Sequence, residues 1–290
     1  MLPLRSLCRN GVRLSKQLPA LQQMAGARFS STDSNVLVSV DDKTGIATLK
    51  LNKKPVNSLN LEFLTDICIN VEKLEQTAKG IILTSALPNI YSAGLDIMEM
   101  YQPKPERLPE FWKMVQEMWL KLYGCQLPVI AAINGNSPAG GCLLSMCADY
   151  RIMAEGKFSI GLNETKLVIF AISRFKDTML NTIGHRQTEK ALQLGTLYST
   201  KEALEIGLID EVVPLDQVQA RAEEQMKSWL AIPGAARAIT KSMMRQATLD
   251  KLLKVRQQDI DVFVQLVTSS AAQKMMGLYM ASLQKKAKKQ

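Results

Sequence analysis

Short apolar runs of strand length alternate with stretches of helical periodicity through the first two-thirds of the chain. For example, Ile81 to Thr84 has the composition of a buried strand, and Phe111 to Leu122, further along, has helical spacing. Strands that alternate with helices favour a layered α/β fold. The other expected strands are 36–40 and 46–51, which flank a hairpin turn, 129–133 and 150–153, and the other expected helices are 61–74 and 140–148.

The last third of the chain has a different pattern. We expect a short helix over 202–206, a strand over 208–213 and helices for the remainder, with a break at Pro233-Gly234. The last long helix carries an apolar stripe formed by Val262, Phe263, Leu266 and Val267. Such a stripe has to be buried, and both packing against the core and formation of a subunit interface remain open.

Residues 1–32 differ from the rest of the chain in composition. They contain five Lys or Arg residues, several serines and no acid before Asp33. This composition predicts a mitochondrial transit peptide, and a merely basic tail is the alternative. Without these residues, Lys plus Arg falls from 36 to 31 against 27 acids, so the net charge falls from +9 to +4.

A net charge of +4, spread among acids, does not indicate nucleic-acid binding, but it suits an anionic ligand. No apolar run approaches the ~20 residues that a membrane-spanning helix needs, so we expect no integral membrane association. His185 is the single histidine, and the five cysteines form no CxxC pair. These counts argue against a multi-histidine or zinc-type metal site. We expect the cysteines to be free and buried, and His185 to follow a helix end at its glycine.

Two glycine-containing loops, 91–97 and 132–142, each follow a short apolar strand. Small residues let a ligand approach the backbone, and two such loops could direct two N–H donors at one oxygen. On spacing alone this is weak evidence, because most glycine loops only turn the chain. Neither loop matches the Walker A or GxGxxG patterns of nucleotide sites.

An ordered set of segments extends through most of the chain after the leader. The segments are Pro55-Val56-Asn57-Ser58-Leu59, Ser92-Ala93-Gly94-Leu95-Asp96, Asn134-Gly135, Pro138-Ala139-Gly140-Gly141-Cys142, Ala148-Asp149-Tyr150-Arg151-Ile152, Gly161-Leu162-Asn163-Glu164-Thr165, Asn181-Thr182-Ile183-Gly184-His185-Arg186 and Ala203-Leu204-Glu205-Ile206-Gly207-Leu208. In this order they resemble the signature of the crotonase superfamily. The segment that contains Glu164 is similar to the 3,2-enoyl-CoA isomerase branch of this superfamily.

The resemblance implies a fold of the α/β class, a spiral of repeated ββα turns over 33–199, with a mainly helical region over 200–290 that forms homotrimers. It implies that the backbone N–H groups of Leu95 and Gly140 form an oxyanion hole for an acyl-CoA thioester. The implied substrate-binding residues are Ala93, Gly94, Leu95, Asp96, Ile97, Gly140 and Asn163. No metal and no cofactor are implied, since CoA is part of the substrate.

Glu164 is the implied catalytic acid/base. Family hydratases carry a second glutamate after the Gly-Gly-Cys, where this chain has Leu143. One carboxylate suffices to move a proton from C2 to C4, so we expect a mitochondrial matrix isomerase that converts 3-enoyl-CoA to 2-trans-enoyl-CoA in fatty-acid β-oxidation. The alternatives are a hydratase or other acyl-CoA activity, and a catalytically silent acyl-CoA-binding paralogue.

Two observations weigh against this assignment. From the residues alone, Asn163 could cap a helix and Glu164 could only favour the positive end of that helix. In addition, residues 168–174 depart from the Gly-Ile-x-x-Pro-like stretch that is usual in family isomerases, with Ser173-Arg174 in place of bulky apolar residues. This departure lies close to the acyl pocket of relatives and bears on chain-length preference and activity.

Overall fold

The computed structural model describes residues 34–169 and 171–287. The residues after Thr32, from 33 to 290, form one compact unit. The predicted transit peptide, residues 1–32, lies outside the described residues. The proposed division of the remainder at residues 199 and 200 stays a prediction.

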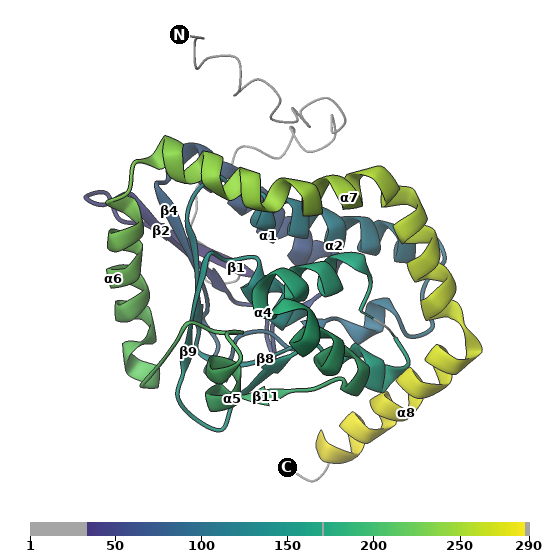
Figure 1. Cartoon of the computed structure of the whole chain (residues 1–290). Helices are drawn as coiled ribbons and strands as arrows, with labels where there is room; N and C mark the ends of the chain where they lie inside the picture. The colour runs from purple at the N-terminus through teal and green to yellow at the C-terminus, as the bar shows by residue number, and fades with distance from the viewer. Residues whose placement is uncertain (1–33, 170, 288–290) are drawn as a thin grey trace. The chain divides into compact units, whose positions relative to one another are not determined.

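A six-stranded sheet forms the centre of the unit, in the order β1-β2-β4-β7-β9-β12 (Figure 1). Its strands are β1 (Val36–Val40), β2 (Ile46–Leu51), β4 (Gly80–Ser85), β7 (Val129–Ile133), β9 (Tyr150–Ala154) and β12 (Glu211–Val213). β1 and β2 form the predicted antiparallel hairpin, and the other neighbours are parallel. Every residue of β4 and β7 is buried, which explains why both read as continuous apolar runs.

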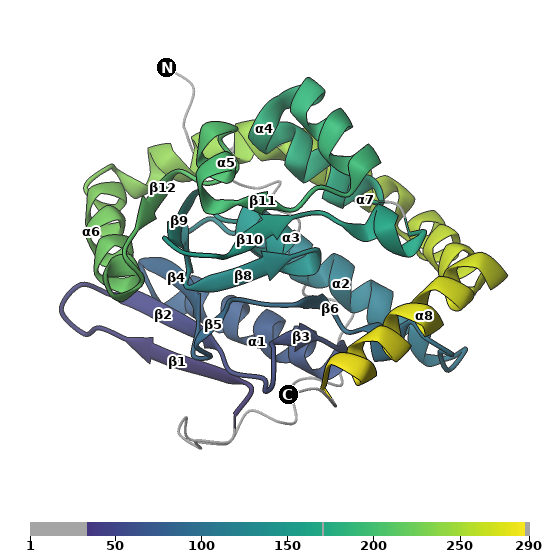
Figure 2. The same ribbon diagram turned by 90° about the horizontal axis from the view of Figure 1, so that it is seen from below.

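Short strands after the central ones form two smaller sheets. They are β3 (Ser58–Leu59), β5 (Asn89–Ile90), β6 (Gly94–Leu95), β8 (Gly135–Pro138), β10 (Ser159–Gly161) and β11 (Tyr198–Ser199). The order β11-β10-β8-β5 makes a four-stranded sheet, and β3 pairs with β6 (Figure 2). The long strands β2, β4, β7 and β9 are each followed by one or two short strands and then by helical segments, which is the ββα repeat implied by the resemblance.

Helices cover both faces of the six-stranded sheet. On one side lie α1 (Leu61–Thr77) and α2 (Arg107–Tyr123), and on the other lies α6 (Val218–Leu230) (Figure 2). The alternation along β4 accounts for this arrangement: Ile81 and Leu83 face the main core, whereas Ile82 packs in a second cluster with Val218 and Met226 of α6. The glycine loops lead to η2 (Ile97–Glu99) and to α3 (Gly140–Met146).

The chain then continues through η3 (Glu164–Leu167), α4 (Ser173–Leu194), α5 (Thr200–Glu205) and η4 (Leu215–Gln217). Gly184 has a non-helical backbone (φ 75°, ψ 170°) that kinks α4, and His185 directly after it is exposed. A helix end was predicted at this glycine, whereas the structure has a kink there, because α4 continues beyond it to Leu194. The strand predicted over 208–213 was too long: only 211–213 pair with β9, because Leu208 and Ile209 turn into the core after Gly207.

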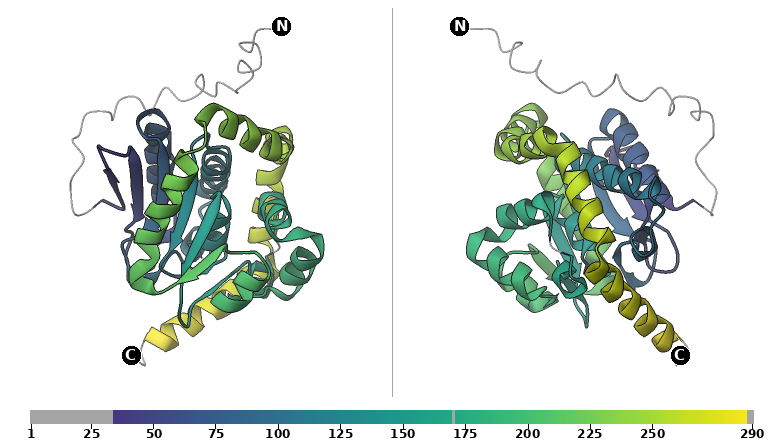
Figure 3. Two further views of the ribbon diagram at one scale, coloured as in Figure 1. Left: turned by 60° about the vertical axis from the view of Figure 1, so that its left-hand side comes forward. Right: turned by 90° about the vertical axis from the view of Figure 1, so that its right-hand side faces the viewer.

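The chain ends in two long helices, α7 (Gly234–Thr268) and α8 (Ser270–Ala287), which run on from one another in Figure 3. The predicted break at Pro233-Gly234 separates α6 from α7. Phe263 and Val267 of the predicted apolar stripe are buried in the main core, whereas Val262 is 37% exposed. Packing back on the core therefore accounts for most of the stripe.

Candidate active site

The first glycine loop is fixed by a short parallel pairing between β3 and β6. The Ala93 N–H donates to the Val56 carbonyl oxygen at 2.9 Å. The Asp96 N–H donates to the Leu59 carbonyl oxygen at 3.0 Å. The loop that contains Leu95 is therefore held at both ends by the same extended segment.

Asn57 holds this loop in place through buried hydrogen bonds. Its backbone has a positive φ of 51°, and its buried side-chain Nδ2 donates to the Tyr91 carbonyl at 2.9 Å and to Ser85 Oγ at 2.8 Å. Ser92 Oγ donates to the Asn57 carbonyl at 2.8 Å and accepts from the Gly94 N–H at 3.1 Å. Asparagine tolerates this backbone conformation, a local signal for a turn, but its buried partners could not be read from the sequence.

The second glycine loop ends at a strained residue. Ala139, which precedes α3, has φ 50° and ψ −122°, a conformation that costs free energy for a residue with a Cβ. Its N–H donates to the Gly161 carbonyl at 2.7 Å, which ties the loop to β10. Gly140 is the first residue of α3, so its N–H has no carbonyl partner within that helix.

The two loops meet at the two predicted oxyanion donors. A Cβ on Gly140 would lie 2.9 Å from the backbone nitrogen of Leu95, and a Cβ on Gly94 would lie 2.9 Å from the backbone nitrogen of Gly140. A Cβ on Gly141 would lie 2.5 Å from the Ser92 carbonyl oxygen. Only glycine at these positions permits the approach, so the structure brings the Leu95 and Gly140 nitrogens to one place.

Glu164 lies three residues beyond Gly161 and starts η3. Both carboxylate oxygens of Glu164 are buried and have no hydrogen-bond partner, although other atoms of the residue leave it partly exposed. Burial raises the pKa of Glu164 to about 7, and its own backbone N–H offsets only part of this effect. A buried carboxyl without a partner is unfavourable for folding and has the ionisation that a proton carrier needs near neutral pH.

Cys142, which precedes Leu143 in α3, lies near the Glu164 carboxylate. The Cys142 and Leu143 side chains are fully buried at the start of α3. Desolvation and the neighbouring Glu164 carboxylate raise the pKa of the Cys142 thiol. The four described cysteines are free and buried, as predicted. Since Leu143 is apolar, the second carboxylate of the hydratases has no counterpart at its position.

Asp96 is engaged in supporting its own loop. It accepts from Ser58 Oγ at 2.9 Å and from the Met98 N–H at 3.0 Å, and it pairs with Lys53 Nζ at 3.3 Å. Ala93 is exposed and Ile97 is partly exposed, so both can be reached by a ligand. The roles of these residues in substrate binding stay predictions.

The helix-start interpretation of Asn163 and Glu164 receives no support from the local geometry. The element that follows Asn163 is a single 3₁₀ turn of four residues, and the Asn163 side chain makes no capping hydrogen bond. Asn163 is partly exposed and packs near Gly195 at the end of α4. Its predicted place beside the acyl chain stays a prediction.

The unusual segment after η3 is largely buried where it is described. Val168 has a positive φ of 59°, whereas Ile169 and Ile172 pack into the core, and Phe170 lies outside the described residues. The Arg174 side chain is fully buried and pairs with Asp259 of α7 at 2.7 Å. No local pattern could indicate this pairing, because the partners are 85 residues apart.

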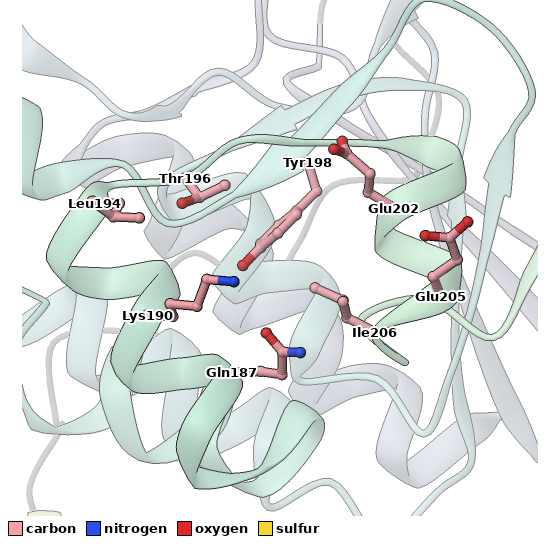
Figure 4. Close-up of a pocket in the computed structure, with 8 residues that line it drawn as sticks. All are labelled: Gln187, Lys190, Leu194, Thr196, Tyr198, Glu202, Glu205 and Ile206. Carbon is pink, nitrogen blue, oxygen red and sulfur yellow. The ribbon is translucent and has the colours of Figure 1, made fainter.

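A pocket of about 300 Å³ lies elsewhere, between α4, β11 and α5 (Figure 4). Its lining residues are Gln187, Lys190, Leu194, Thr196, Tyr198, Glu202, Glu205 and Ile206. Figure 4 shows the Tyr198 hydroxyl and the Lys190 amine pointing toward each other. The Glu202 carboxylate already accepts from the N–H and hydroxyl of Ser199. Since this pocket contains neither Glu164 nor the two glycine loops, we place the chemistry at the loops.

Among residues 34–169 and 171–287, no group of three or more His, Cys, Asp or Glu side chains is arranged to hold a metal ion. Within the same ranges, no helix is long and apolar enough to cross a membrane.

Comparison with known proteins gives a consistent picture. The profile of the "Enoyl-CoA hydratase/isomerase" family matches residues 41–289. The chain is 49% identical to mouse "Enoyl-CoA delta isomerase 1, mitochondrial" over 285 residues, with 97% of each chain covered. It is 46% identical to the human protein of the same name, covering 97% of this chain and 95% of the human protein.

Solved structures show the same relationship. The crystal structure of human mitochondrial delta3-delta2-enoyl-CoA isomerase superposes with a TM-score of 0.86 at 47% identity, covering 87% of this chain and 99% of that one. An enoyl-CoA hydratase from Bacillus halodurans has a TM-score of 0.76 at 23% identity, covering 84% of this chain and 100% of that one. At that identity, the likeness shows the fold alone.

Proposed function

The chain belongs to the enoyl-CoA hydratase/isomerase family, and on this premise we propose how it converts a 3-enoyl-CoA to the 2-trans-enoyl-CoA. The activity itself follows from relatives at 46–50% identity over nearly the full length, all of which are named enoyl-CoA delta isomerase. The observation that carries the mechanism is the buried, unpartnered carboxylate of Glu164, with a pKa of about 7.

In the proposed mechanism, the thioester oxygen of the substrate accepts hydrogen bonds from the N–H groups of Leu95 and Gly140. The Glu164 carboxylate removes a proton from C2, and the electron pair moves into the thioester to form an enolate. The two N–H groups stabilise the negative charge on the enolate oxygen. Glu164 then returns the proton to C4, so that the double bond lies between C2 and C3.

This cycle regenerates the Glu164 carboxylate and consumes no water, metal or redox equivalent. We therefore propose that the enzyme needs no cofactor. A pKa of about 7 suits both proton transfers, because Glu164 has to accept the C2 proton and then donate it to C4 with similar barriers. The substrate class, an acyl-CoA thioester, supplies the CoA moiety that the loop from Ala93 to Ile97 is proposed to bind.

Hydration is the second candidate activity, and Leu143 is the observation against it. The Leu143 side chain is fully buried at the place where a second carboxylate would position a water molecule.

A catalytically silent paralogue is the third candidate, and it is based on the departure of residues 168–174 from the family pattern. Arg174 in that segment pairs with Asp259, and the pKa of Glu164 is set by burial and by its own backbone. The departure thus leaves the carboxyl in a state fit for proton transfer.

The test of this function is a direct assay. Purified full-length protein would be given 3-enoyl-CoAs of several chain lengths and, in parallel, crotonyl-CoA with water as the second substrate. We expect isomerisation to exceed hydration by roughly 100-fold or more, as befits a site with one general acid/base. Faster hydration would support the second candidate, and tight binding of the CoA ester without turnover would support the third.

We further propose that the protein is a homotrimer whose C-terminal helices form the contacts. Eight large apolar side chains in the last 60 residues are 37–78% exposed, namely Ile232, Ile239, Met243, Met244, Val262, Leu278, Tyr279 and Leu283. Exposed apolar side chains at this density are typical of subunit interfaces. Light scattering of the purified protein would show three times the mass of one chain, and a monomer would contradict the proposal.

The protein acts in mitochondria, as the names of its relatives at 46–50% identity state for those proteins. We propose the matrix as its compartment, with residues 1–32 as the targeting segment. A reporter fused to residues 1–35 should enter the matrix, whereas a diffuse cytosolic signal would contradict this assignment.

A further inference from the structure

A fully buried ion pair joins the start of α4 to α7. Arg174 Nη1 donates to Asp259 Oδ2 at 2.7 Å, and the two side chains are 0% and 2% exposed. The same carboxylate oxygen accepts from Trp112 Nε1 and from Gln116 Nε2, both at 2.8 Å. The guanidinium lies 4.2 Å from the centre of the Trp112 ring, so α2, α4 and α7 all meet at this pair.

The ion pair leaves several of its own buried polar atoms without a hydrogen-bond partner, which is unfavourable for a purely structural contact. Arg174 Nε and Nη2 and Asp259 Oδ1 are buried without a hydrogen-bond partner. Buried ion pairs seldom stabilise a fold more than apolar side chains of the same volume, and this one leaves three polar atoms unpartnered. A cation is also disfavoured in the first turn of a helix, where Arg174 lies. Stability alone therefore does not explain why the pair is there.

The position of the pair in the chain suggests what it does. Glu164 starts η3, which ends at Leu167, and the next residue, Val168, has a positive φ of 59° that is strained for a β-branched residue. A strained backbone persists only where the surrounding structure holds it in place. The Ile169 N–H donates to the Glu164 carbonyl at 3.3 Å, so the connection after Val168 bears directly on the backbone of Glu164. Arg174 is the first charged residue after this connection and anchors its far end.

We propose that Arg174 and Asp259 are positioning residues for Glu164. By fixing the start of α4 against α7, the pair holds Ile172 and, through the packing of Ile169, the strained Val168 in place. It thereby keeps the Glu164 carboxyl buried and directed at the substrate. The pair does not touch the reacting atoms. The inference rests on the proposed role of Glu164, and it assigns a reason to the departure of residues 168–174 from the family pattern.

The test uses the double variant Arg174→Met/Asp259→Asn in the full chain. Methionine replaces the aliphatic stem of arginine but carries no charged head, and asparagine keeps an oxygen that can accept from Trp112 and Gln116. Loss of positioning should lower kcat roughly 10- to 100-fold with little change in KM. Water admitted to a looser site should also move the acid limb of the pH profile of kcat/KM from about pH 7 toward the ordinary range of a carboxyl. A folded variant with normal kcat and an unmoved acid limb would overturn the proposal.

Four further variants make the outcome specific. Arg221→Met removes a partly buried guanidinium that pairs with Glu211 on β12, and as a control it should leave kcat and the pH profile unchanged. Val168→Asn relieves the backbone strain, so adding the double variant to it should cost less activity than adding it to the native chain. Should the double variant fail to fold, Arg174→Lys keeps a positive charge beside Asp259 but loses the guanidinium geometry, and it permits the same comparison. If Glu164→Gln stays active, the proposed function fails; if only the double variant stays active, this inference alone fails.

Discussion

The backbone nitrogen of Leu95 lies 2.9 Å from the point where a Cβ on Gly140 would stand. Gly140 and Leu95 belong to loops that are 45 residues apart in sequence, and the pairing of β3 with β6 and of β8 with β10 brings them together. The two loops can therefore approach each other this closely only while residue 140 is glycine. If both nitrogens bind the thioester oxygen, a side chain at residue 140 should stop the chemistry.

Gly140→Ala tests this relationship. The added methyl group would lie 2.9 Å from the Leu95 nitrogen and 3.2 Å from Gly94 Cα, so the loops would have to separate. We expect kcat to fall by roughly 10²- to 10³-fold, the usual effect of losing one oxyanion donor. Gly234→Ala is the control, because a methyl group there would meet only the far end of Arg237, 3.9 Å away. Steady-state kinetics of both folded variants would test this prediction. Equal kcat values for the two variants would contradict the assignment of the Gly140 N–H to the oxyanion hole.

The long elements could be predicted from the sequence, whereas the site geometry could not. The strand over 129–133 was found residue for residue, because a run buried on both sides leaves an unbroken apolar pattern. Strands such as β6 and β10, two and three residues long, are too short to show a period. The positive φ of Ala139 could not be predicted, because alanine does not favour that conformation and the surrounding structure imposes it.

Prediction of the site depended on the resemblance, which identified the residues and their roles but not the burial and hydrogen bonding of their side chains. Glu164 could be identified in this way, but the lack of any hydrogen-bond partner for its carboxyl is a property of the packed structure. The buried partner of Arg174 lies on a helix 85 residues away, so no local pattern could reveal it. What the sequence did indicate was that this segment is unusual.

The pH dependence of catalysis should report the ionisation of Glu164. Its carboxyl must be deprotonated to accept the C2 proton, and burial raises its pKa to about 7. We expect kcat/KM to rise tenfold per pH unit below about pH 7 and to level off above it. Measurement from pH 5 to pH 9 would show this limb. An acid limb near pH 4.5, the ordinary value for a glutamate, would mean that the carboxyl is solvated in the working enzyme.

Leu143→Glu should shift the activity toward hydration. A carboxylate at this position could hold the water molecule that hydration needs, so the ratio of hydration to isomerisation should rise by about 10-fold or more. The variant will be less stable, because Leu143 is fully buried and a charge there loses its solvation. Leu144→Glu, also fully buried but on another face of α3, is the matched control. It should destabilise the fold similarly and leave the ratio unchanged.

Glu164→Gln separates catalysis from stability most sharply. Glutamine keeps the shape of the side chain but cannot accept the C2 proton, so isomerisation should fall by roughly 10²- to 10⁴-fold. Binding of a CoA ester should change little, since its affinity is assigned to the loop over 93–97. Isothermal titration with a saturated acyl-CoA would measure that affinity independently of turnover.

The stability of the same variant has a predictable sign. The pKa of Glu164 is raised in the folded state, so the native protein binds a proton more tightly than the unfolded chain, and this stabilisation is lost as the pH rises from about 4.5 through about 7. Each pKa unit corresponds to about 1.4 kcal/mol, which puts this penalty on the order of 3 kcal/mol at pH 8 and near zero below pH 4.5. Glu164→Gln should therefore melt at an equal or higher temperature at pH 8, and this advantage should fade at low pH. A carboxylate that only stabilised a helix start would give the opposite pair of results, a lower melting temperature with turnover intact.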